Sequence, residues 1–385
     1  MPGVHAVGAI DWDRKIFDEI ILLPDGTTYN SYLIQGSDKT VLIDTVDPTK
    51  TEELVDNLSE LNAKVDYVIA QHAEQDHSGS LPKILEVYPD AKLLTNPKCK
   101  ELLKDLLLIP EERIITVEDG ETVSLGDKTL KFIYTPWVHW PDTMVTYLEE
   151  DKILFTCDFF GTHLAESNLF LTDEHLVYRA AKRYYAEIMM PFRMIIQKNM
   201  EKIKDLDVEI VAPSHGPLYN KPEMIFESYN EWISNETKNE VIIPYVSMHG
   251  STKEIVDHLV DILIRNGITV KPFNLTTSDI GELATSLVDA STVIIATPTV
   301  LTGPHPSAVY AAYLVNVLRP KLKFVSIVGS YGWGGRTVDL LKGILTNIRA
   351  EVIDPVIVKG HPKEDDFKKI DALADEIIKK HNDLF

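Results

Sequence analysis

The chain has 385 residues, of which 44% are hydrophobic and 25% are charged; this is typical of a folded globular protein and favours two domains over one core. Its 38 basic and 59 acidic residues give a formal net charge of −21, which repels nucleic acid and anionic membranes and excludes nucleic-acid partners. No apolar run is long enough to cross a membrane and no signal peptide is recognisable at the start, so we expect a cytoplasmic protein without a membrane contact.

The first part of the chain mixes β-rich runs with helical stretches. The runs include "TTYNSYLIQG", "TVLIDTVD", "KTLKFIYTP" and "KILFTCDFF", and helices are predicted from Thr51 to Leu61 and from Glu174 to Met190. This mixture predicts a mixed α/β domain with antiparallel hairpins over residues 1–238. The polar stretch from Asn230 to Glu240 is the predicted linker.

The second part, residues 239–385, has a regular pattern. Its five apolar runs are "VIIPYVS", "TVKPFNL", "STVIIATPT", "LKFVSIVGS" and "AEVIDPVIV", and a segment of helix length separates each run from the next. Strands that are apolar on both faces and alternate with helices predict a parallel sheet covered on both sides. We therefore predict a flavodoxin-like, doubly wound sheet with strand order 2-1-3-4-5.

Potential metal ligands gather in the stretch "QHAEQDHSGS", which follows the strand-like run "KVDYVIA". Three more candidates each close a β-like run further along, in "WVHWPD", "FTCDFFG" and "APSHGP". An H-x-[HE]-x-D-H stretch on a loop that leaves a strand resembles the metal loop of the metallo-β-lactamase fold. The predicted ligands are His72, Glu74, Asp76, His77, His139, Asp158 and His215.

These seven nitrogen and oxygen ligands suit two metal ions with open positions better than one closed structural zinc site, which favours thiolates. The two cysteines, Cys99 and Cys157, form no C-x-x-C pair and are expected to be small core or loop residues. The natural division gives one metal His72, Glu74 and His139, the other metal Asp76, His77 and His215, and Asp158 as the bridge. Two histidines and a terminal carboxylate on each metal suit iron that binds O2. A histidine outside this set, such as His163 or His175, is expected to be a surface or hydrogen-bonded residue.

Glu74 distinguishes a redox site from a hydrolytic one. Hydrolases of the metallo-β-lactamase fold usually have a neutral histidine at this position, which leaves the metals strongly Lewis acidic. The extra negative charge of Glu74 favours the oxidised state of a metal pair and makes electron donation easier. A redox centre is therefore the favoured interpretation.

Three loops at the ends of strands in the second part predict an FMN site. The stretch "SMHGST" is a hydroxyl-rich turn before an amphipathic helix, where backbone N–H groups favour a phosphate. It is neither a Walker A loop nor a G-x-G-x-x-G fingerprint. In a 2-1-3-4-5 sheet it meets "TPTVLTG" and "SYGWGG" at the switch point. The candidate residues are Ser247, Met248, His249, Gly250, Ser251, Thr252, Thr297, Pro298, Thr299, Val300, Leu301, Thr302, Gly303, Ser330, Tyr331, Gly332, Trp333, Gly334 and Gly335.

Each of these features also has a plain structural interpretation. Serine and threonine often cap helices at such turns. Trp333 can be a buried aromatic residue beside a glycine turn. His77 can point away from the metals, since adjacent residues point in different directions.

The motifs "GTTYNSYL", "HAEQDH", "HWPDTM", "DFFGTH", "PSHG", "SMHGSTKE", "TPT" and "YGWGG" together resemble those of the flavodiiron proteins over essentially the whole chain. That resemblance implies a metallo-β-lactamase-like diiron domain followed by a flavodoxin domain, with FMN and two non-haem iron ions. The family pattern falls on the seven ligands above, although its members differ over whether the residue that matches His77 binds iron. His249 and Gly250 depart from the bulkier residues common in the flavin loop.

The resemblance implies reduction of O2 to water or of nitric oxide to nitrous oxide, with no catalytic residue apart from the metal ligands. The sequence resembles the methanogen branch, whose donor is reduced coenzyme F420; reduced rubredoxin is the alternative donor. The chain has no C-x-x-C pairs of a rubredoxin-like extension, so we expect an external donor. Two other classes stay open: a zinc hydrolase fused to a flavodoxin, and an electron carrier or oxygen sensor without turnover.

A head-to-tail homodimer, or a dimer of such dimers, is also expected. The metal ligands lie at the edge of a domain that ends near residue 240, and the flavin loops lie at the carboxyl edge of the next domain. The short linker leaves little freedom to bring those two edges together within one chain. A two-fold axis can bring each edge to its counterpart on the partner, as the resemblance also implies.

Overall fold

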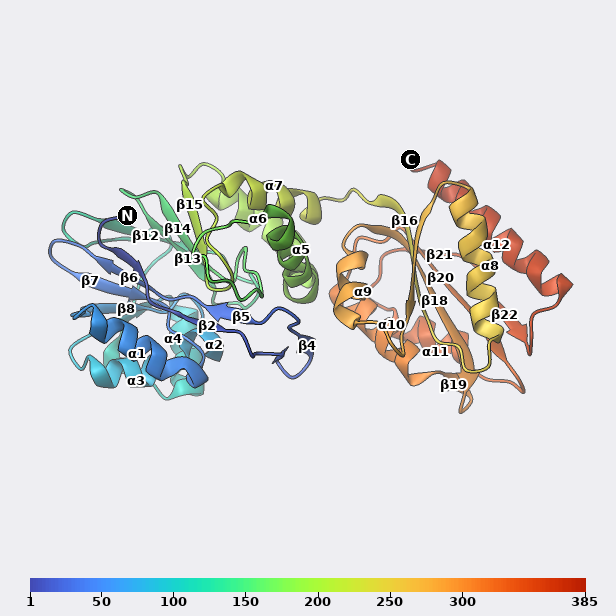
Figure 1. Cartoon of the computed structure of the whole chain (residues 1–385), viewed down its shortest axis with the longest axis horizontal. Coiled ribbons are helices and arrows are strands. Elements are labelled where there is room, and N and C mark those ends of the chain that lie inside the picture. The colour runs from blue at the N-terminus through green and yellow to red at the C-terminus, as the bar shows by residue number, and fades with distance from the viewer. The chain divides into compact units, whose positions relative to one another are not determined.

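The computed structural model describes all 385 residues. They form two compact units, Met1–Ile233 and Ser234–Phe385, whose elements are labelled in Figure 1. The predicted fold class is confirmed for both: the first unit is a sandwich of two mixed sheets and the second is a doubly wound parallel sheet.

The connection between the units is shorter than the predicted linker. Helix α7 (Pro222–Ile233) ends the first unit and strand β16 (Lys238–Tyr245) begins the second, so only residues 234–237 lie between them. The boundary between the units falls within the predicted linker from Asn230 to Glu240, but the first residues of that stretch belong to α7 and the last belong to β16. Trp232 is fully buried and anchors the last turn of α7 to the first unit, although most neighbouring residues in the sequence are polar.

Two facing sheets form the middle of the first unit. The first sheet combines antiparallel and parallel pairs, in the order β1 (Val4–Ala6), β6 (Tyr32–Gln35), β7 (Thr40–Ile43), β8 (Tyr67–Ile69), β9 (Lys92–Thr95) and β10 (Ile114–Thr116). The second sheet has the order β11 (Thr122–Ser124), β12 (Thr129–Tyr134), β13 (Met144–Leu148), β14 (Ile153–Cys157) and β15 (Ile210–Pro213). The register of β14 against β15 shifts between Phe155 and Cys157, which marks a bulge one residue before Asp158.

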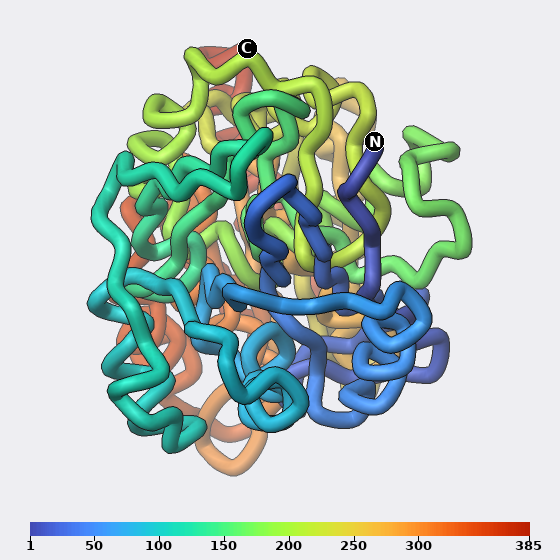
Figure 2. The backbone as a smooth tube through the Cα atoms, turned by 90° about the vertical axis from the view of Figure 1, so that its left-hand side faces the viewer, coloured from blue at the N-terminus to red at the C-terminus, as the bar shows by residue number.

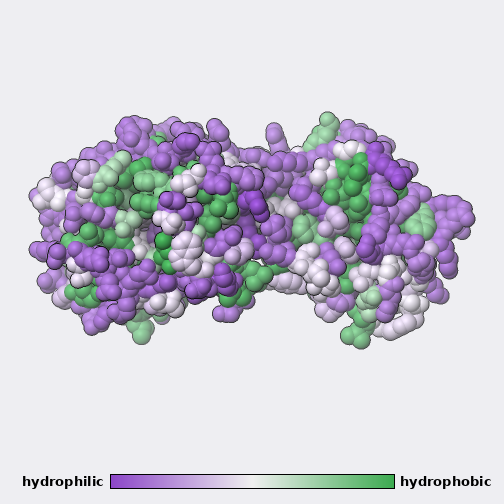
Figure 3. Space-filling model, viewed as in Figure 1, coloured by the Kyte–Doolittle hydropathy of each residue, from purple (hydrophilic) through white to green (hydrophobic).

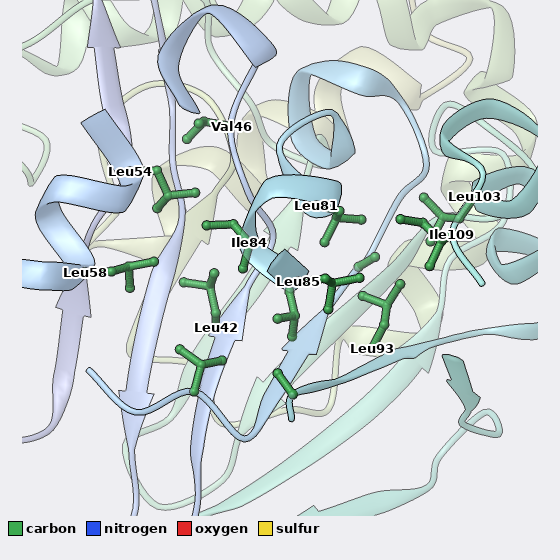
Figure 4. Packing of buried hydrophobic residues seen from close by; sticks show 14 of the residues in the cluster. Leu42, Val46, Leu54, Leu58, Leu81, Ile84, Leu85, Leu93, Leu103 and Ile109 are labelled. Atoms are coloured by element: carbon green, nitrogen blue, oxygen red, sulfur yellow. The ribbon is translucent and has the colours of Figure 1, made fainter. Parts of the chain in front are cut away.

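Side chains of β7 show how the sequence creates these layers. Successive residues of a strand point to opposite faces. Leu42 accordingly packs with the helices outside the first sheet, whereas Val41 and Ile43 pack against the second sheet. In the core outside the sheet, Leu42 lies with Leu54 and Leu58 of α1 (Figure 4). Each fully buried leucine contributes about 1.5–3 kcal/mol to folding.

Helices cover both outer faces of the sandwich (Figures 1 and 2). The helices on the first sheet are α1 (Thr51–Glu60), α3 (Leu81–Val87) and α4 (Pro97–Leu107), and those on the other side are α5 (Glu174–Tyr184), α6 (Arg193–Ile203) and α7. Short turns of helix are α2 (Gln75–Ser78) and the 3-10 turns Pro48–Lys50, Glu111–Arg113 and Met190–Phe192. The helix predicted from Glu174 to Met190 changes at its end, because α5 continues as a π-helical turn over Tyr185–Met189.

Two small antiparallel pairs lie near the start of the chain: β2 (Ala9–Asp11) with β5 (Thr27–Tyr29), and β3 (Ile16–Phe17) with β4 (Ile21–Leu22). The run "TTYNSYLIQG" is therefore two strands rather than one, because β5 pairs with β2 and β6 joins the first large sheet. Between them, the Asn30 amide donates to the carbonyl oxygens of Pro213 and Gly216 (2.9 and 2.8 Å). This contact ties the break to the end of β15.

The second unit has the predicted strand order 2-1-3-4-5. In space its strands follow as β17 (Thr269–Asn274), β16, β18 (Ala290–Val300), β20 (Phe324–Tyr331) and the split fifth strand, β21 (Glu351–Val352) and β22 (Val356–Lys359). A short strand, β19 (Gly303–Pro304), folds back on β18. Helices α8 (Ser251–Arg265) and α12 (Glu364–Asn382) pack together, and so do α9 (Ile280–Leu287), α10 (Pro306–Leu318) and α11 (Thr337–Ile344).

Strand β17 departs from the expectation that every strand is apolar and covered on both faces. It is an edge strand, and most of its residues are exposed or half-buried. Pro272 and Lys271 lie within it, and both residue types are suited to an edge because they discourage pairing with another strand.

Charge is distributed unequally between the units. Residues 1–233 contain 22 basic and 41 acidic residues, a formal charge of −19, whereas residues 234–385 contain 16 and 18, a formal charge of −2. The repulsion of anions expected from the whole chain therefore applies mainly to the first unit.

The helices of this structure are too short or too polar to cross a membrane. The face viewed in Figure 3 is largely hydrophilic, with separate hydrophobic patches on each unit.

Candidate functional site

The seven predicted metal ligands gather at one edge of the sandwich, where strands of both sheets end. His72 and Glu74 follow β8, and Asp76 and His77 lie on the short helix α2. The remaining three come from the second sheet: His139 in the β12–β13 connection, Asp158 after β14 and His215 after β15. Rigid strands therefore position loops that are far apart in sequence.

The first group of ligand atoms belongs to His72, Glu74, His139 and Asp158, all within 4.8 Å of one another. The carboxylate Oε2 of Glu74 lies 3.2 Å from Nε2 of His72 and 3.0 Å from Nε2 of His139. Glu74 is thus in direct contact with both imidazoles of its group.

The second group is Asp76, His77 and His215, again within 4.8 Å. Nε2 of His215 lies 3.1 Å from Oδ2 of Asp76, and Nε2 of His77 lies 3.4 Å from Oδ1 of the same residue. His77 therefore points into this group rather than away from it.

Asp158 lies between the two groups and turns one oxygen to each. Its Oδ2 is 3.5 Å from Nε2 of His72 and 3.4 Å from Nε2 of His139. Its Oδ1 is 3.0 Å from Nε2 of His77 and 3.4 Å from Nε2 of His215. A carboxylate in this arrangement can bridge two metal ions.

Several buried polar atoms of the site fit metal ions. Both carboxylate oxygens of Asp76, Nε2 of His77 and Oδ2 of Asp158 are buried without a hydrogen-bond partner. Such atoms are costly to bury unless a partner satisfies them. Imidazole nitrogens and carboxylate oxygens are the donors that iron and zinc accept, so the residues present fit a pair of these ions.

Cys157 also lies near His77 and Asp158. Both cysteines are fully buried, as expected for core residues. Burial raises the pKa of the Cys157 thiol well above its usual range, so the thiol stays protonated and is a poor metal ligand.

The charges of the two groups stabilise each other. Burial would raise the pKa of Asp158, but His77 and His139 hold it well below its usual range. Burial would lower the pKa of His139 and His215, yet hydrogen bonds to Asp158 and the other carboxylates outweigh burial and raise the pKa to about 9 for His139 and to about 10 for His215. A metal ion that binds these nitrogens must displace their protons.

Other groups hold the imidazoles in place from behind. Nδ1 of His72 lies 3.3 Å from Oδ2 of Asp142, which also accepts a hydrogen bond from the backbone N–H of Ala73 (2.8 Å). Nδ1 of His215 donates to the carbonyl oxygen of Thr28 (2.6 Å). In both rings this leaves Nε2 for the centre, as in many metal sites. The sequence analysis did not single out Asp142. The one signal for it was its position three residues after His139, in the stretch "WVHWPD".

Tyr184 is a second residue that the sequence did not reveal. Its hydroxyl group, at the end of α5, donates to Oδ1 of Asp158 (2.8 Å). Nearby, Nδ1 of His163 lies 2.9 Å from the Thr27 hydroxyl, so His163 is a hydrogen-bonded residue outside both groups, as predicted. His175 is exposed, also as predicted.

The three candidate flavin loops lie at the carboxyl ends of β16, β18 and β20, which are neighbouring parallel strands. A contact between hydroxyl groups connects the first loop to the third, with Thr252 Oγ1 3.1 Å from Ser330 Oγ. Thr299 Oγ1 of the second loop lies 2.7 Å from Thr337 Oγ1 at the start of α11. Helix α8 begins at Ser251, directly after Gly250. A phosphate at this helix end would meet backbone N–H groups and the positive end of the helix dipole.

The loops also offer open, apolar surface. Met248 is 49% exposed, Trp333 is 79% exposed and Leu301 is 87% exposed. The interpretation of Trp333 as a buried aromatic residue is therefore wrong. Gly250 and Gly334 have positive φ angles (91° and 116°) with no atom within 4 Å of an added Cβ, so a flat ligand has room beside the backbone.

Comparisons with known proteins cover nearly the whole chain. Residues 27–216 match the model of the family described as ODP family beta lactamase. Among curated relatives, a nitric oxide reductase of Moorella thermoacetica is 36% identical, with 97% of this chain and 96% of the relative covered. A coenzyme F420H(2) oxidase of Methanothermobacter marburgensis is 32% identical, with 91% and 90% covered.

Solved structures agree with these relatives. Rubredoxin oxygen:oxidoreductase from Desulfovibrio gigas matches with a TM-score of 0.96 and 31% identity, covering 99% of this chain and 98% of that one. The flavodiiron protein from Giardia intestinalis matches with a TM-score of 0.88 and 28% identity, covering 99% and 97%.

Proposed function

Since this chain belongs to the flavodiiron protein family, we propose that it reduces O2 to water with electrons from reduced coenzyme F420. Flavodiiron proteins carry FMN and a non-haem diiron centre, and this chain is an oxidoreductase. The coenzyme F420H(2) oxidase relative supports this donor. The alternative is a rubredoxin-dependent reductase of O2 or nitric oxide, which the Moorella relative and the Desulfovibrio structure support.

For the metal centre we propose the division expected from the sequence. His72, Glu74 and His139 would hold one iron, Asp76, His77 and His215 would hold the other, and Asp158 would bridge them. The observation that supports this most strongly is the pair of Asp158 oxygens, each directed at a different group. When bound, the iron pair supplies the electrons and open coordination positions that O2 reduction needs.

The site also supports redox chemistry over hydrolysis. Glu74 touches both imidazoles of its group and brings a negative charge where hydrolases of this fold usually have a neutral ligand. A zinc hydrolase fused to a flavodoxin is therefore the less favoured function. Metal analysis that found two zinc ions and no iron in the purified protein would revive it.

For the flavin we propose that FMN binds at the carboxyl ends of β16, β18 and β20. The phosphate would lie against the 247–252 turn at the start of α8, and the ring would lie near Tyr331, Trp333 and the 297–303 segment. The unit with this site, residues 239–385 by our prediction, has a formal charge near zero, which suits an anionic cofactor better than the acidic first unit.

The donor and acceptor are tested in one set of assays. Oxygen consumption is measured with reduced coenzyme F420 and, separately, with reduced rubredoxin; nitric oxide consumption is measured with each donor as well. We expect the fastest turnover with reduced coenzyme F420 and O2. Faster turnover with rubredoxin would favour the alternative donor, and binding of both cofactors without turnover would indicate an electron carrier or sensor.

We further propose a head-to-tail homodimer in which the FMN of one chain serves the diiron centre of the other, with a dimer of dimers as a possible larger assembly. The two candidate sites lie on separate units joined by four residues. The cytoplasmic location expected from the sequence also stays a prediction.

Mixed dimers test this arrangement. One chain loses its metal site (His72→Ala with Asp158→Ala) and the other loses its flavin site (Ser251→Ala with Thr252→Ala). Transfer between chains predicts that verified mixed dimers regain oxidase activity through one intact pair of sites. Inactive mixed dimers, whose parents each keep their remaining cofactor, would rule the arrangement out.

A further inference from the structure

His163 is a buried histidine beside the candidate metal centre that belongs to neither group of predicted ligands. One of its ring nitrogens, Nδ1, lies 2.9 Å from the Thr27 hydroxyl. The other, Nε2, is buried without a hydrogen-bond partner in the protein. A buried polar atom is costly unless a partner satisfies it. The imidazole therefore needs a partner that the chain itself does not provide.

A small cavity lies against His163. Its volume is about 20 Å³, and its lining includes Pro24 and Asp25, which are exposed, so the cavity lies just below the surface. Arg183 and Glu187, which form an ion pair with 3.2 Å between Nε and Oε1, line it as well. A water molecule needs a space of about 10–15 Å³ and two to four polar partners. The cavity thus has room for one water molecule and polar residues to bind it.

Hydrogen bonds lead from His163 to a predicted ligand of the second group. The Thr27 hydroxyl, which contacts His163, donates to the carbonyl oxygen of Thr28 (3.2 Å). The same carbonyl oxygen accepts a hydrogen bond from Nδ1 of His215 (2.6 Å), and that nitrogen is 3.5 Å from Thr27 Oγ1. The rings of His163 and His215 are also only 4.9 Å apart between centroids. A change in the position of His163 is therefore expected to reach His215.

The first group of predicted ligands has a different support. Nδ1 of His72 lies 3.3 Å from a carboxylate oxygen of Asp142, with no residue between them. The two histidines that face the candidate centre from opposite sheets are thus held by separate contacts. A change in the support of His215 should affect the second group and leave the first group as it is.

We propose that the cavity binds one water molecule, which pairs with Nε2 of His163, and that His163 positions His215 through Thr27. This inference rests on the proposed metal centre, because His215 is one of its ligands. Water suits the cavity better than a cation, since it can donate to Nε2 or accept from it and so satisfies either neutral form of the imidazole. His163 and Thr27 are positioning residues, which act on the metal only through His215.

High-resolution crystal structures of the zinc-loaded protein test the water site. The comparison is between the unmodified protein and Ala180→Val, which adds two methyl groups to a residue that lines the cavity. We expect a water oxygen about 2.7–3.2 Å from Nε2 of His163 in the unmodified protein and none in Ala180→Val. An unmodified protein without water next to Nε2, or with that nitrogen bonded to a protein group, would overturn the proposal.

Zinc binding to the metal-free protein, measured by competition with a chromogenic chelator, tests the positioning role. His163→Phe keeps a ring in place but removes both nitrogens. Thr27→Val keeps the shape of threonine but removes the hydroxyl group. Thr27→Ser is the matched control, because it keeps the hydroxyl group that contacts His163 and Thr28.

We expect His163→Phe and Thr27→Val to weaken the binding of one zinc ion by about 10-fold, the lower end of the effect of losing an outer hydrogen-bond partner. The other zinc ion and both sites of Thr27→Ser should keep their affinity. NMR of the imidazole nitrogens should identify the weakened site as the one with His215. A general loosening of the fold would instead weaken both sites equally.

Equal weakening of both sites, or unchanged affinities in His163→Phe and Thr27→Val, would contradict the positioning role. Failure of the proposed metal centre has a different signature. In that case the unmodified protein itself would bind fewer than two zinc ions per chain.

Discussion

The two candidate sites differ in how completely the protein builds them. The candidate metal ligands are nearly buried, lie close to one another and are held in place by Asp142, Thr28 and Tyr184. The candidate flavin loops instead expose Trp333 and Leu301 and leave open space beside Gly250, Gly332 and Gly334. A metal ion binds through short, directional contacts and needs its ligands in place, whereas a large flat cofactor covers backbone and apolar surface itself.

The two units also differ in net charge. The unit with the metal ligands has a formal charge of −19 and attracts cations, while the unit with the flavin loops has a formal charge of −2 and admits an anionic cofactor. Each unit is thus electrostatically suited to a different kind of ligand. Four changes can break or sharpen this contrast.

The largest effect is expected for Asp158→Asn, because this carboxylate touches both groups. The amide keeps the shape but offers only one oxygen and no charge. We expect metal affinity to fall by more than the roughly 10- to 100-fold typical of losing an outer hydrogen-bond partner, with loss of turnover. Iron content per chain and oxidase activity measure the effect. Tyr184→Phe, which keeps the carboxylate, is the control; normal iron content in Asp158→Asn would contradict the bridge.

Replacing Ser251 and Thr252 together by alanine should release FMN and leave both irons bound, since the two sites lie in separate units. Two hydrogen bonds to a charged phosphate contribute about 3 kcal/mol or more in total, which is roughly a 100-fold weaker dissociation constant. Thr252 also lies 3.1 Å from Ser330, so circular dichroism should check that the fold persists. Yellow protein at full flavin stoichiometry would count against this phosphate site.

Glu74→His should keep metal binding and lose most O2 reduction. Histidine can still bind a metal, but the negative charge beside His72 and His139 disappears. The reduction potential of the metal pair then changes and is no longer suited to passing electrons to O2. A roughly 10-fold loss of turnover or more is expected, similar to the removal of a tuning partner. Metal analysis accompanies the oxygen assay. Unchanged turnover with full iron content would disprove the redox role of Glu74.

The smallest effect concerns the metal-free protein and pH. The pKa values of His139 and His215 rise from 6.5 to about 9 and about 10 on folding, so their stabilising effect is full below pH 6.5 and is lost as pH rises through 9 and 10. The melting temperature should therefore fall between pH 6.5 and pH 9.5, by roughly 2–4 °C for each kcal/mol lost. Calorimetry measures it. With zinc bound the imidazoles stay neutral, so this decrease should largely disappear; equal decreases in both forms would contradict the assignment.

Local patterns predicted most of the architecture because they reflect burial directly. The five runs of the second unit became the strands of a 2-1-3-4-5 sheet. Four candidate ligands were recognisable because they share one stretch after a β-like run, and His139, Asp158 and His215 because each closes such a run and strand ends meet at an edge. Tyr184 was not, because nothing in the pattern of α5 shows which residue reaches another element. The length of the linker was overestimated because Trp232, which anchors α7, lies among polar residues in the sequence.

The bulge in β14 has a consequence for how this chain tolerates insertions and deletions. The register shift between Phe155 and Cys157 sets the face on which the following Asp158 emerges. Because side chains alternate along a strand, loss of one residue at this point turns Asp158 away from the histidines, while most single replacements nearby leave its direction unchanged. An insertion or deletion in this strand is therefore more damaging to the metal centre than a substitution of one of its residues.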